Sequence, residues 1–280
     1  MNPFLHFIVA LLSNKKVTYE GKMIILQQIK KVKMSSVLSK NQIKLIKSLS
    51  QKKYRQQLNL FIVEGVKGII EFLNSDFELE TLYTTKPIFN APADCILGIS
   101  EADLQKISTL KNPNTALAIF KIPEKKKPIN KGLIIALDAI RDPGNLGTII
   151  RLCDWYGVKD LVCSINTVDC YNAKVVQATM GSLTRVNVSY LDLDDYLKSN
   201  ETEVFGTFMK GENIYTTDLP NEGVVVLGNE ANGISEAITS KVKRQITIPQ
   251  FGNTKSTESL NVANATAIVL SEFRRRIIEM

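Results

Sequence analysis

Residues 133–140 form an almost continuous apolar run, and this run constrains the fold more than any other stretch of the chain. A strand with one face in water alternates apolar and polar residues, whereas a strand buried on both faces does not. The run therefore predicts a central strand of a parallel sheet with helices on both faces. Short apolar segments continue the pattern, with helical segments between them, at residues 160–163, 186–189, 204–207, 223–227 and 245–248. Residues 132–280 are thus predicted to form a C-terminal parallel α/β domain.

Residues 34–121 show a different pattern, in which helices and strands alternate over a shorter length. Apolar segments at 60–65, 79–84, 95–99 and 115–120 predict strands, and the stretches between them predict helices. We expect a small N-terminal α/β sandwich domain. Residues 122–131 contain two prolines and a lysine run, a composition typical of a linker.

Residues 1–33 form a leader that does not fit either domain. Its apolar run at residues 4–12 is too short to cross a bilayer, and its lysines come only after that run. Neither a signal peptide nor a membrane anchor is expected. Because globular patterning begins at Met34, we expect the leader to be either a mis-assigned start or a disordered basic arm.

The net charge of +7 is unevenly distributed along the chain. Residues 34–131 hold fifteen Lys and Arg against nine Asp and Glu, whereas residues 132–280 hold fourteen against eighteen. A basic front half indicates contact with a polyanion, with a solvated lysine-rich surface as the alternative. No acidic residue lies between positions 35 and 63, and the candidate phosphate contacts in that stretch are Lys40, Lys44, Lys47, Lys52, Lys53 and Arg55.

The only histidine of the chain is His6, in the leader. This excludes Ser-His-Asp triads, Cys-His pairs and most zinc or iron sites, so no metal is expected. Chemistry must depend on carboxylates, amides, hydroxyls, arginine or a cofactor that carries the reactive group. The cysteines have no metal-type spacing and are expected to be small core residues in a reducing compartment, the cytoplasm; they are Cys95, Cys153, Cys163 and Cys170.

Three polar loop clusters follow predicted strands, at residues 142–151, 227–235 and 248–265. No G-x-G-x-x-G follows the first strand of the C-terminal domain, so a Rossmann dinucleotide site is not supported. Ile234 stands where a P-loop would carry its lysine, which excludes that motif as well. What remains is N-x-G-x-x-x-R, G-x-E and I-P…S-L-N-V, formed by Asn145, Gly147 and Arg151, by Gly228 and Glu230, and by Ile248, Pro249, Ser259, Leu260, Asn261 and Val262.

Together these residues resemble the three motifs of the SpoU (TrmH) family of RNA 2′-O-methyltransferases, in the same order and within one domain. The resemblance covers residues 132–280, and the basic front domain resembles, by pattern only, the ribosomal-protein-like RNA-binding domain of many relatives. It implies a deep trefoil knot, S-adenosylmethionine bound in the knotted loops, and a homodimer whose protomers complete the site. Ribosomal RNA is the expected substrate, with transfer RNA as second choice. The loop between Ile248 and Ser259 is longer than the family pattern, which leaves its geometry open.

The resemblance also assigns roles to individual residues. The candidate catalytic residues are Asn145, Arg151, Glu230, Ser259 and Asn261, and the candidate cofactor-binding residues are Gly228, Ile248 and Leu260. Arg151 is expected to hold the phosphate beside the target ribose, with Asn145 supporting it and Ser259 or Asn261 near the methyl donor.

Each of the polar candidates also has a purely structural interpretation. Asn145, Glu230 and Ser259 can each cap a helix, and Arg151 can be an ordinary solvated side chain. Two other functions stay open: a non-catalytic RNA-binding or ribosome-assembly protein on the same fold, and a knotted enzyme that methylates a base.

Overall fold

The computed structural model of the 280-residue chain describes residues 37–252 and 259–278. They belong to two compact units, Met1–Pro123 and Glu124–Met280. The leader at residues 1–33 and the middle of the loop between Ile248 and Ser259 lie outside the described residues. No described helix is both long and apolar enough to cross a membrane.

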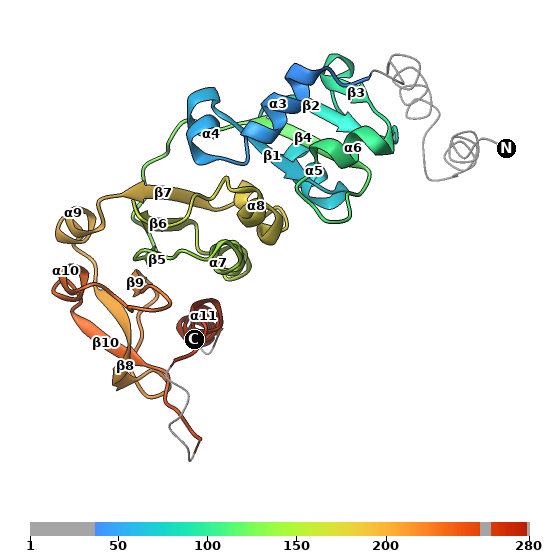
Figure 1. The fold of residues 1–280 in the computed structure, drawn as a ribbon. Helices are drawn as coiled ribbons and strands as arrows, with labels where there is room; N and C mark the ends of the chain where they lie inside the picture. The colour runs from blue at the N-terminus through green and yellow to red at the C-terminus, as the bar shows by residue number, and fades with distance from the viewer. Residues whose placement is uncertain (1–36, 253–258, 279–280) are drawn as a thin grey trace. The chain divides into compact units, whose positions relative to one another are not determined.

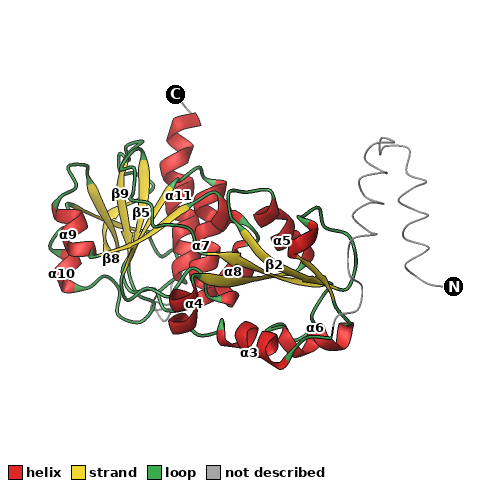
Figure 2. Ribbon diagram, turned by 90° about the horizontal axis from the view of Figure 1, so that it is seen from above, coloured by secondary structure: helices red, strands yellow, loops and turns green. Residues whose placement is uncertain are grey.

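Unit 1 is built on a four-stranded sheet with the order β1-β4-β2-β3. Its strands are β1 (Leu60–Glu64), β2 (Leu79–Thr84), β3 (Ile96–Gly98) and β4 (Ala116–Lys121). Strand β4 pairs antiparallel with β1 and β2, whereas β2 and β3 are parallel. Helices α3 (Lys40–Ser48) and α6 (Glu101–Ile107) cover one face of the sheet and α5 (Val66–Leu73) covers the other (Figure 2). A short turn, η1 (Ala93–Cys95), precedes β3.

The two faces of this sheet have different cores. Under α5, the rings of Phe61, Phe72 and Phe120 pack against one another in edge-to-face and tilted arrangements, with centroid distances of 5.3–6.1 Å. Under α3 and α6, the core is aliphatic and includes Ile46, Leu49, Ile62, Leu104, Ile107 and Leu117. The sheet is therefore covered by apolar side chains on both sides, which explains why β1 and β4 are buried almost throughout.

The basic segment before β1 forms two helices, α3 and α4 (Lys52–Leu58). Ser39 starts α3 with a capping box, because its hydroxyl accepts the Gln42 N–H at 3.2 Å and the Gln42 side chain accepts the Ser39 N–H at 2.9 Å. The lysines Lys40, Lys44, Lys47, Lys52 and Lys53 are all exposed.

The prediction that Arg55 contacts RNA is wrong. Its side chain is only 2% exposed, and Nη1 donates to the carbonyls of Leu49 and Ser50, both at 2.9 Å. The last carbonyls of a helix have no partner within it. The guanidinium of Arg55 satisfies such groups after α3 and so fixes the turn into α4.

Unit 2 contains a six-stranded sheet in which every pair of neighbours is parallel. The strand order is β10-β8-β9-β5-β6-β7. The strands are β5 (Leu133–Leu137), β6 (Asp160–Ser164), β7 (Asn187–Leu191), β8 (Val204–Asn213), β9 (Gly223–Leu227) and β10 (Arg244–Thr247). All residues of β5 are buried, so the predicted central strand of a parallel sheet is confirmed.

Helices cover both faces of this sheet (Figure 1). One face carries α7 (Pro143–Trp155), α8 (Ala173–Thr179) and α11 (Val262–Ile278), and the other carries α9 (Leu193–Lys198) and α10 (Glu236–Thr239). The 3-10 turn η2 (Ser182–Thr184) follows α8. Gly147 allows α7 and α8 to approach closely, because a Cβ at this position would lie 2.4 Å from the Cβ of Ala178. This glycine of the first motif therefore has a packing role.

The second half of the expected linker is bound to unit 2. The carbonyl of Lys126 accepts from the Ser189 hydroxyl at 2.8 Å, and the Ile129 N–H donates to Asp160 at 2.9 Å. Unit 2 accordingly begins at Glu124 and not at residue 132.

The cysteines, all of which lie in the described part of the chain, form no disulfide. Cys153, Cys163 and Cys170 are buried, as predicted, whereas Cys95 is partly exposed. Burial raises the pKa of the Cys153 and Cys163 thiols, so they remain protonated packing groups.

Candidate active site

The candidate residues gather at the carboxyl end of the unit 2 sheet, where the strand order reverses. Strand β5 lies between β6 and β9, and ligands of parallel α/β sheets bind at such a switch point. The loops after β5 and β9 are tied together here. The Asp138 N–H donates to the Leu227 carbonyl at 2.9 Å, and the Asn229 amide donates to the Ala139 carbonyl at 2.7 Å.

Three of the predicted residues, one from each motif, form a continuous chain of hydrogen bonds. The Asn261 Nδ2 donates to the Asn145 Oδ1 at 2.9 Å, across 116 residues of sequence. The Asn145 Nδ2 donates in turn to the Glu230 Oε1 at 3.0 Å, across 85 residues. The first, second and third motifs are therefore joined by side-chain amides and one carboxylate.

The structure rules out the interpretation of Asn145 and Glu230 as helix caps. Asn145 is not the cap of α7, because Asp142 holds that position and accepts the Asn145 N–H at 2.8 Å. Glu230 does not cap the following helix, since α10 begins after Ser235, whose N–H donates to Asp138. Both side chains are thus available to link the loops.

The third motif combines a structural and a linking function. Asn261 caps α11, because its Oδ1 accepts the N–H groups of Ala263 at 2.9 Å and Asn264 at 3.2 Å. Its Nδ2 remains for the bond to Asn145. Ser259 does not take the cap position, and in the described part of the chain its hydroxyl makes no hydrogen bond.

The carboxylate of Glu230 lies over the start of α7. Besides the Asn145 amide, it accepts the N–H groups of Arg141 and Asp142, each at 3.4 Å. The N-terminus of a helix carries a partial positive charge that stabilises a nearby carboxylate. Glu230 is therefore held in place by donors that precede and belong to α7.

Arg151 lies two turns beyond Asn145 on α7 and is exposed. Among the described residues its guanidinium has neither a hydrogen bond nor an ion pair. By contrast, Arg274 of α11 donates to the Tyr156 carbonyl at 2.8 Å, at the other end of α7. The guanidinium of Arg151 therefore presents its N–H donors to solvent.

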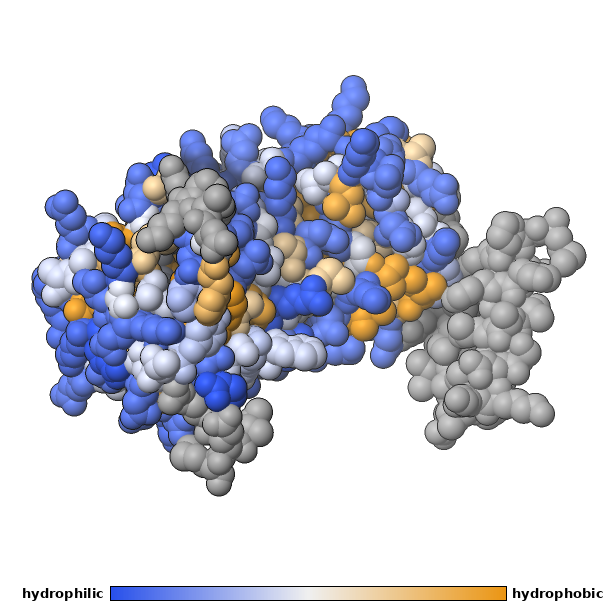
Figure 3. Space-filling view, turned by 90° about the horizontal axis from the view of Figure 1, so that it is seen from below, coloured by the Kyte–Doolittle hydropathy of each residue, from blue (hydrophilic) through white to orange (hydrophobic). Residues whose placement is uncertain are grey.

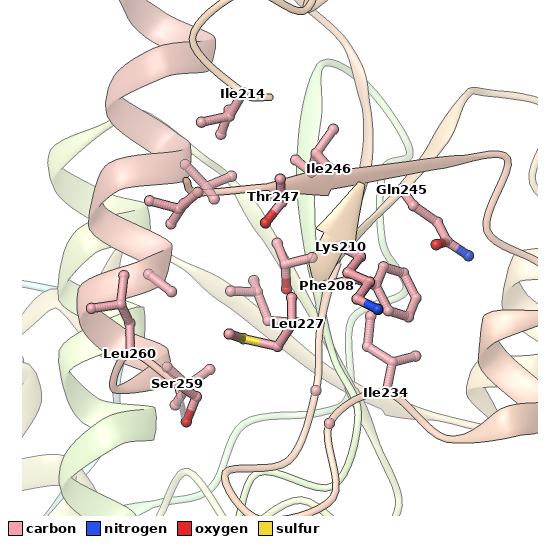
Figure 4. A pocket seen from close by; sticks show the side chains of 18 of the residues that line it. Phe208, Lys210, Ile214, Leu227, Ile234, Gln245, Ile246, Thr247, Ser259 and Leu260 are labelled. Carbon is pink, nitrogen blue, oxygen red and sulfur yellow. The ribbon is translucent and has the colours of Figure 1, made fainter. Parts of the chain in front are cut away.

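A pocket of about 1080 Å³ adjoins the chain of hydrogen bonds (Figure 4). Among its lining residues are five of the predicted ones, Gly228, Glu230, Ile248, Ser259 and Leu260. Figure 4 shows Ser259 and Leu260 near the start of α11 on one side of the cavity and Phe208 and Lys210 on the other. Asn145, Arg151 and Asn261 do not line it, and Glu230 is the connection between the pocket and the amides.

Gly228 is required by the backbone conformation of its own loop. A Cβ at this position would lie 2.1 Å from the carbonyl carbon of Gly233 and 2.2 Å from the nitrogen of Ile234. The loop closes there through paired backbone bonds between Asn229 and Gly233, both at 2.9 Å. Only glycine allows the loop to fold back this tightly beside the pocket.

Part of the lining was not predicted from the sequence, namely Thr207, Phe208, Met209 and Lys210 of β8. The strand was expected to end at residue 207, but it continues to Asn213. Its pairing with β10 shifts from Gly206↔Gln245 to Glu212↔Ile246, so the residues between turn toward the cavity. The only sequence signal is Gly211, where a Cβ would lie 2.5 Å from the carbonyl oxygen of Gln245.

Known proteins with this combination of motifs and fold identify the family. Residues 132–271 match the model of the SpoU rRNA Methylase family, and residues 40–118 match that of an MRM3-like substrate binding domain. The chain belongs to the SpoU rRNA methylase family. None of the described residues forms a cluster of His, Cys, Asp or Glu that could hold a metal ion.

The similarity extends over nearly the whole of several relatives. The 23S rRNA (guanosine(2553)-2′-O)-methyltransferase RlmP of Bacillus subtilis is 31% identical over 246 residues, which cover 84% of this chain and 97% of the relative. A TrmH-family protein from Porphyromonas gingivalis superposes with a TM-score of 0.80 and is 38% identical, covering 86% of this chain and all of its own. An AdoMet-bound rRNA methyltransferase from Sinorhizobium meliloti superposes with a TM-score of 0.77 at 29% identity, covering 88% and 99%.

The hydrogen-bond chain makes a testable prediction for Asn145→Asp. The variant replaces a donor with a second carboxylate beside Glu230, and we expect the free energy of unfolding at pH 7.5 to fall by about 1–3 kcal/mol. Two adjacent carboxylates raise the pKa of one of them in the folded state, so the loss should fade as the pH falls and a shared proton is taken up. Denaturant unfolding at pH 7.5 and pH 5 measures both effects.

The matched control is Asn264→Asp, which adds an acid to the first turn of α11 away from Glu230. An acid there faces the positive end of the helix and should be neutral or slightly stabilising. Equal destabilisation by both variants, or a loss for Asn145→Asp that does not depend on pH, would contradict the proposed link.

Proposed function

We propose that this protein transfers the methyl group of S-adenosylmethionine to a ribose 2′-hydroxyl of ribosomal RNA. The observation that carries the proposal is the hydrogen-bond chain Asn261–Asn145–Glu230, which joins all three motif loops at the edge of one pocket. The activity named for the Bacillus subtilis relative supports the reaction and the RNA class. The bound AdoMet of the Sinorhizobium meliloti enzyme supports the cofactor.

The pocket fits this cofactor. Its volume of about 1080 Å³ is at the upper end of small-molecule sites, which span roughly 300–1,000 Å³. Apolar side chains such as Leu227, Ile234 and Leu260 can flank a flat adenine ring, and Lys210 and Ser259 supply polar groups at the same cavity. When bound, the cofactor supplies an electrophilic methyl group on a sulfonium centre.

The residues of this chain then have to position the RNA and its hydroxyl. Arg151 is exposed and makes no ion pair among the described residues, so its fork can hold the phosphate next to the target ribose. Asn145 is fixed from both sides by Asn261 and Glu230 and can orient a ribose oxygen without moving itself. In the pocket proposed for the methyl donor, Ile248 and Gly228 shape the wall through their main chain, and Ser259 contributes a hydroxyl. Such positioning suits a site that has no histidine.

The same contacts support a knotted path of the chain. Strand β10 lies at one edge of the sheet, whereas α11, which follows it, packs against α7 beside the central strands. Asn261, just before α11, bonds to Asn145 at the start of α7, so the third motif meets the first although β10 stands at the edge of the sheet. We propose that the C-terminal part of the chain is threaded through a loop, which gives the deep trefoil knot implied by the three motifs.

Unit 1 is proposed to bind the RNA substrate. The exposed lysines Lys40, Lys44, Lys47, Lys52 and Lys53 lie in a stretch without acidic residues, and the match of this unit to a substrate-binding domain supports this role. We also propose that the protein works in the cytoplasm, which the absence of disulfides among the described cysteines supports.

A homodimer formed through unit 2 is the proposed assembly. Trp155, the only tryptophan, is 83% exposed at the end of α7. Tryptophan is rarely so exposed in a monomer and is enriched at interface centres. On the face shown in Figure 3, hydrophilic residues predominate and apolar residues form smaller patches. Arg151 lies one turn earlier on the same side of α7, so pairing there would bring it to the partner's surface.

The purified protein should bind S-adenosylmethionine with a dissociation constant near 1 μM, about −8 kcal/mol. Incubation with unmodified rRNA and labelled cofactor should leave the label on a ribose 2′-oxygen, as mapped by nuclease digestion and mass spectrometry. No calorimetric heat and no thermal shift at millimolar cofactor would identify a non-catalytic RNA-binding protein. Label on a base would identify a base methyltransferase.

Arg151→Ala should lower the single-turnover rate by roughly a hundredfold while cofactor affinity stays within about threefold, because lost positioning acts on the reacting geometry. Arg151→Lys keeps the charge but loses the planar fork, and it should also lose most activity. The control is Arg275→Ala, which removes an exposed arginine of α11 that pairs with Glu272. Methylation by Arg151→Ala at the wild-type rate would remove Arg151 from the site.

Trp155→Ala should convert the dimer to a monomer at tens of micromolar protein, as measured by light scattering. Ile129→Ser, at a residue 72% exposed on the segment before β5, should stay dimeric. Since Trp155 is the only tryptophan, its emission in the wild type should shift to longer wavelength as dilution separates the protomers. A monomeric wild type at tens of micromolar contradicts the proposed assembly.

A further inference from the structure

Unit 1 contains a second hollow, and none of the motif residues line it. It has a volume of about 500 Å³ and lies where α3 ends and α4 begins. We call it the α3–α4 groove. The residues that line it are Asn41, Lys44, Leu45, Lys47, Ser48, Gln51 and Tyr54.

The α3–α4 groove has a fixed floor. Leu49, in the turn between the two helices, is buried in the aliphatic core. The guanidinium of Arg55 donates to the carbonyls of Leu49 and Ser50 from beneath the same turn. Backbone bonds from Tyr54 and Arg55 to the Gln51 carbonyl, each at 3.2 Å, continue the turn into α4. A groove held in this way keeps its shape before any ligand arrives.

Of the polar side chains that line the groove, the Ser48 hydroxyl is used within α3, where it donates to the Leu45 carbonyl at 2.7 Å, and the others are not used by the fold. In the described part of the chain, the amides of Asn41 and Gln51, the ammonium groups of Lys44 and Lys47 and the hydroxyl of Tyr54 make no hydrogen bond or ion pair. Tyr54 is 37% exposed, so part of its ring is open to the groove. An unused aromatic ring, two cations and two amides thus surround one hollow.

This combination matches the chemistry of an unpaired nucleotide. Proteins recognise single-stranded RNA by stacking bases on aromatic rings and by bonding the exposed base edges with polar side chains. Lysines beside such a ring contact the flanking phosphates. A duplex, whose bases are stacked inside, would use the lysines but neither the ring nor the hollow.

We propose that the α3–α4 groove binds one unpaired nucleotide of the RNA substrate, with its base stacked on Tyr54 and its flanking phosphates on Lys44 and Lys47. The proposal rests on the proposed RNA-modifying function and assigns a defined nucleotide site within unit 1. The amides of Asn41 and Gln51 reach the base edge and give the site a preference among bases. Arg55 is a positioning residue that acts through the turn.

The test compares binding of a short labelled single-stranded RNA with binding of its perfect duplex, by fluorescence anisotropy with the full chain. Tyr54→Ala should weaken single-strand binding about tenfold and leave duplex binding unchanged, because stacking is lost. Tyr54→Phe keeps the ring and should bind like the wild type. Leu58→Ala, one turn further along α4 at a residue 39% exposed, is the matched truncation and should also bind like the wild type.

Substitution of Lys44 and Lys47 should affect RNA binding differently from substitution of Tyr54. Lys44→Gln combined with Lys47→Gln should weaken the binding of both RNAs and flatten the dependence of affinity on salt, since phosphate contacts are lost. Equal loss of single-strand and duplex binding in Tyr54→Ala, or no loss, would overturn the stacking site and leave a lysine-rich phosphate surface.

A direct measurement in the wild type avoids any effect of substitution on folding. Single-stranded RNA that carries 4-thiouridine should crosslink on irradiation to a peptide containing Tyr54, as identified by mass spectrometry. Crosslinks confined to other peptides would overturn the site. Cofactor affinity and 2′-O-methyl transfer are measured on the same protein. If both are observed but no RNA crosslinks to the Tyr54 peptide, the groove proposal is wrong and the proposed function still stands.

Discussion

The first turn of α7 holds the site together, because two loops that are far from it in the sequence, those of Glu230 and Asn261, bond to it or to the two residues before it. Asp142 caps the helix, Glu230 accepts the N–H groups of Arg141 and Asp142, and Asn145 links Glu230 to Asn261. A helix start has unpaired donors and a partial positive charge, so a carboxylate from another loop is stabilised there. Pocket, amide chain and Arg151 are all positioned relative to this turn.

The sequence predicted the elements of the fold well, since buried parallel strands such as β5 and β9 are apolar throughout and need no partner to be recognised. It also singled out one residue from each motif, Asn145, Glu230 and Asn261, that the structure joins by hydrogen bonds. It did not predict how they meet, because the bond from Asn261 to Asn145 depends on tertiary packing across 116 residues. The extension of β8 was missed for the same reason, since its shift in pairing follows from contact with β10 and not from any local pattern.

Three arginines show why residue type and position do not by themselves define a role. Arg55 and Arg274 both donate to main-chain carbonyls near helix ends, and burial lowers the pKa of Arg274 without removing its charge. Arg151 is exposed and donates to none of the described groups. In a run of basic residues such as 52–55, only the structure separates Arg55, which stabilises the turn, from the neighbouring lysines that reach solvent. Donors that the fold leaves unused are the ones free to bind a substrate.

The same criterion explains why a basic surface alone is not enough for unit 1. Lysines contact phosphates that every RNA shares, so they raise affinity without selecting a position. A methyltransferase that modifies a defined ribose also needs groups that contact bases, and these must be both unpaired and rigid to discriminate. Tyr54, Asn41 and Gln51 meet the first condition, and the turn held by Arg55 meets the second. The buried arginine that failed as a phosphate contact thereby supports the surface that can select the RNA.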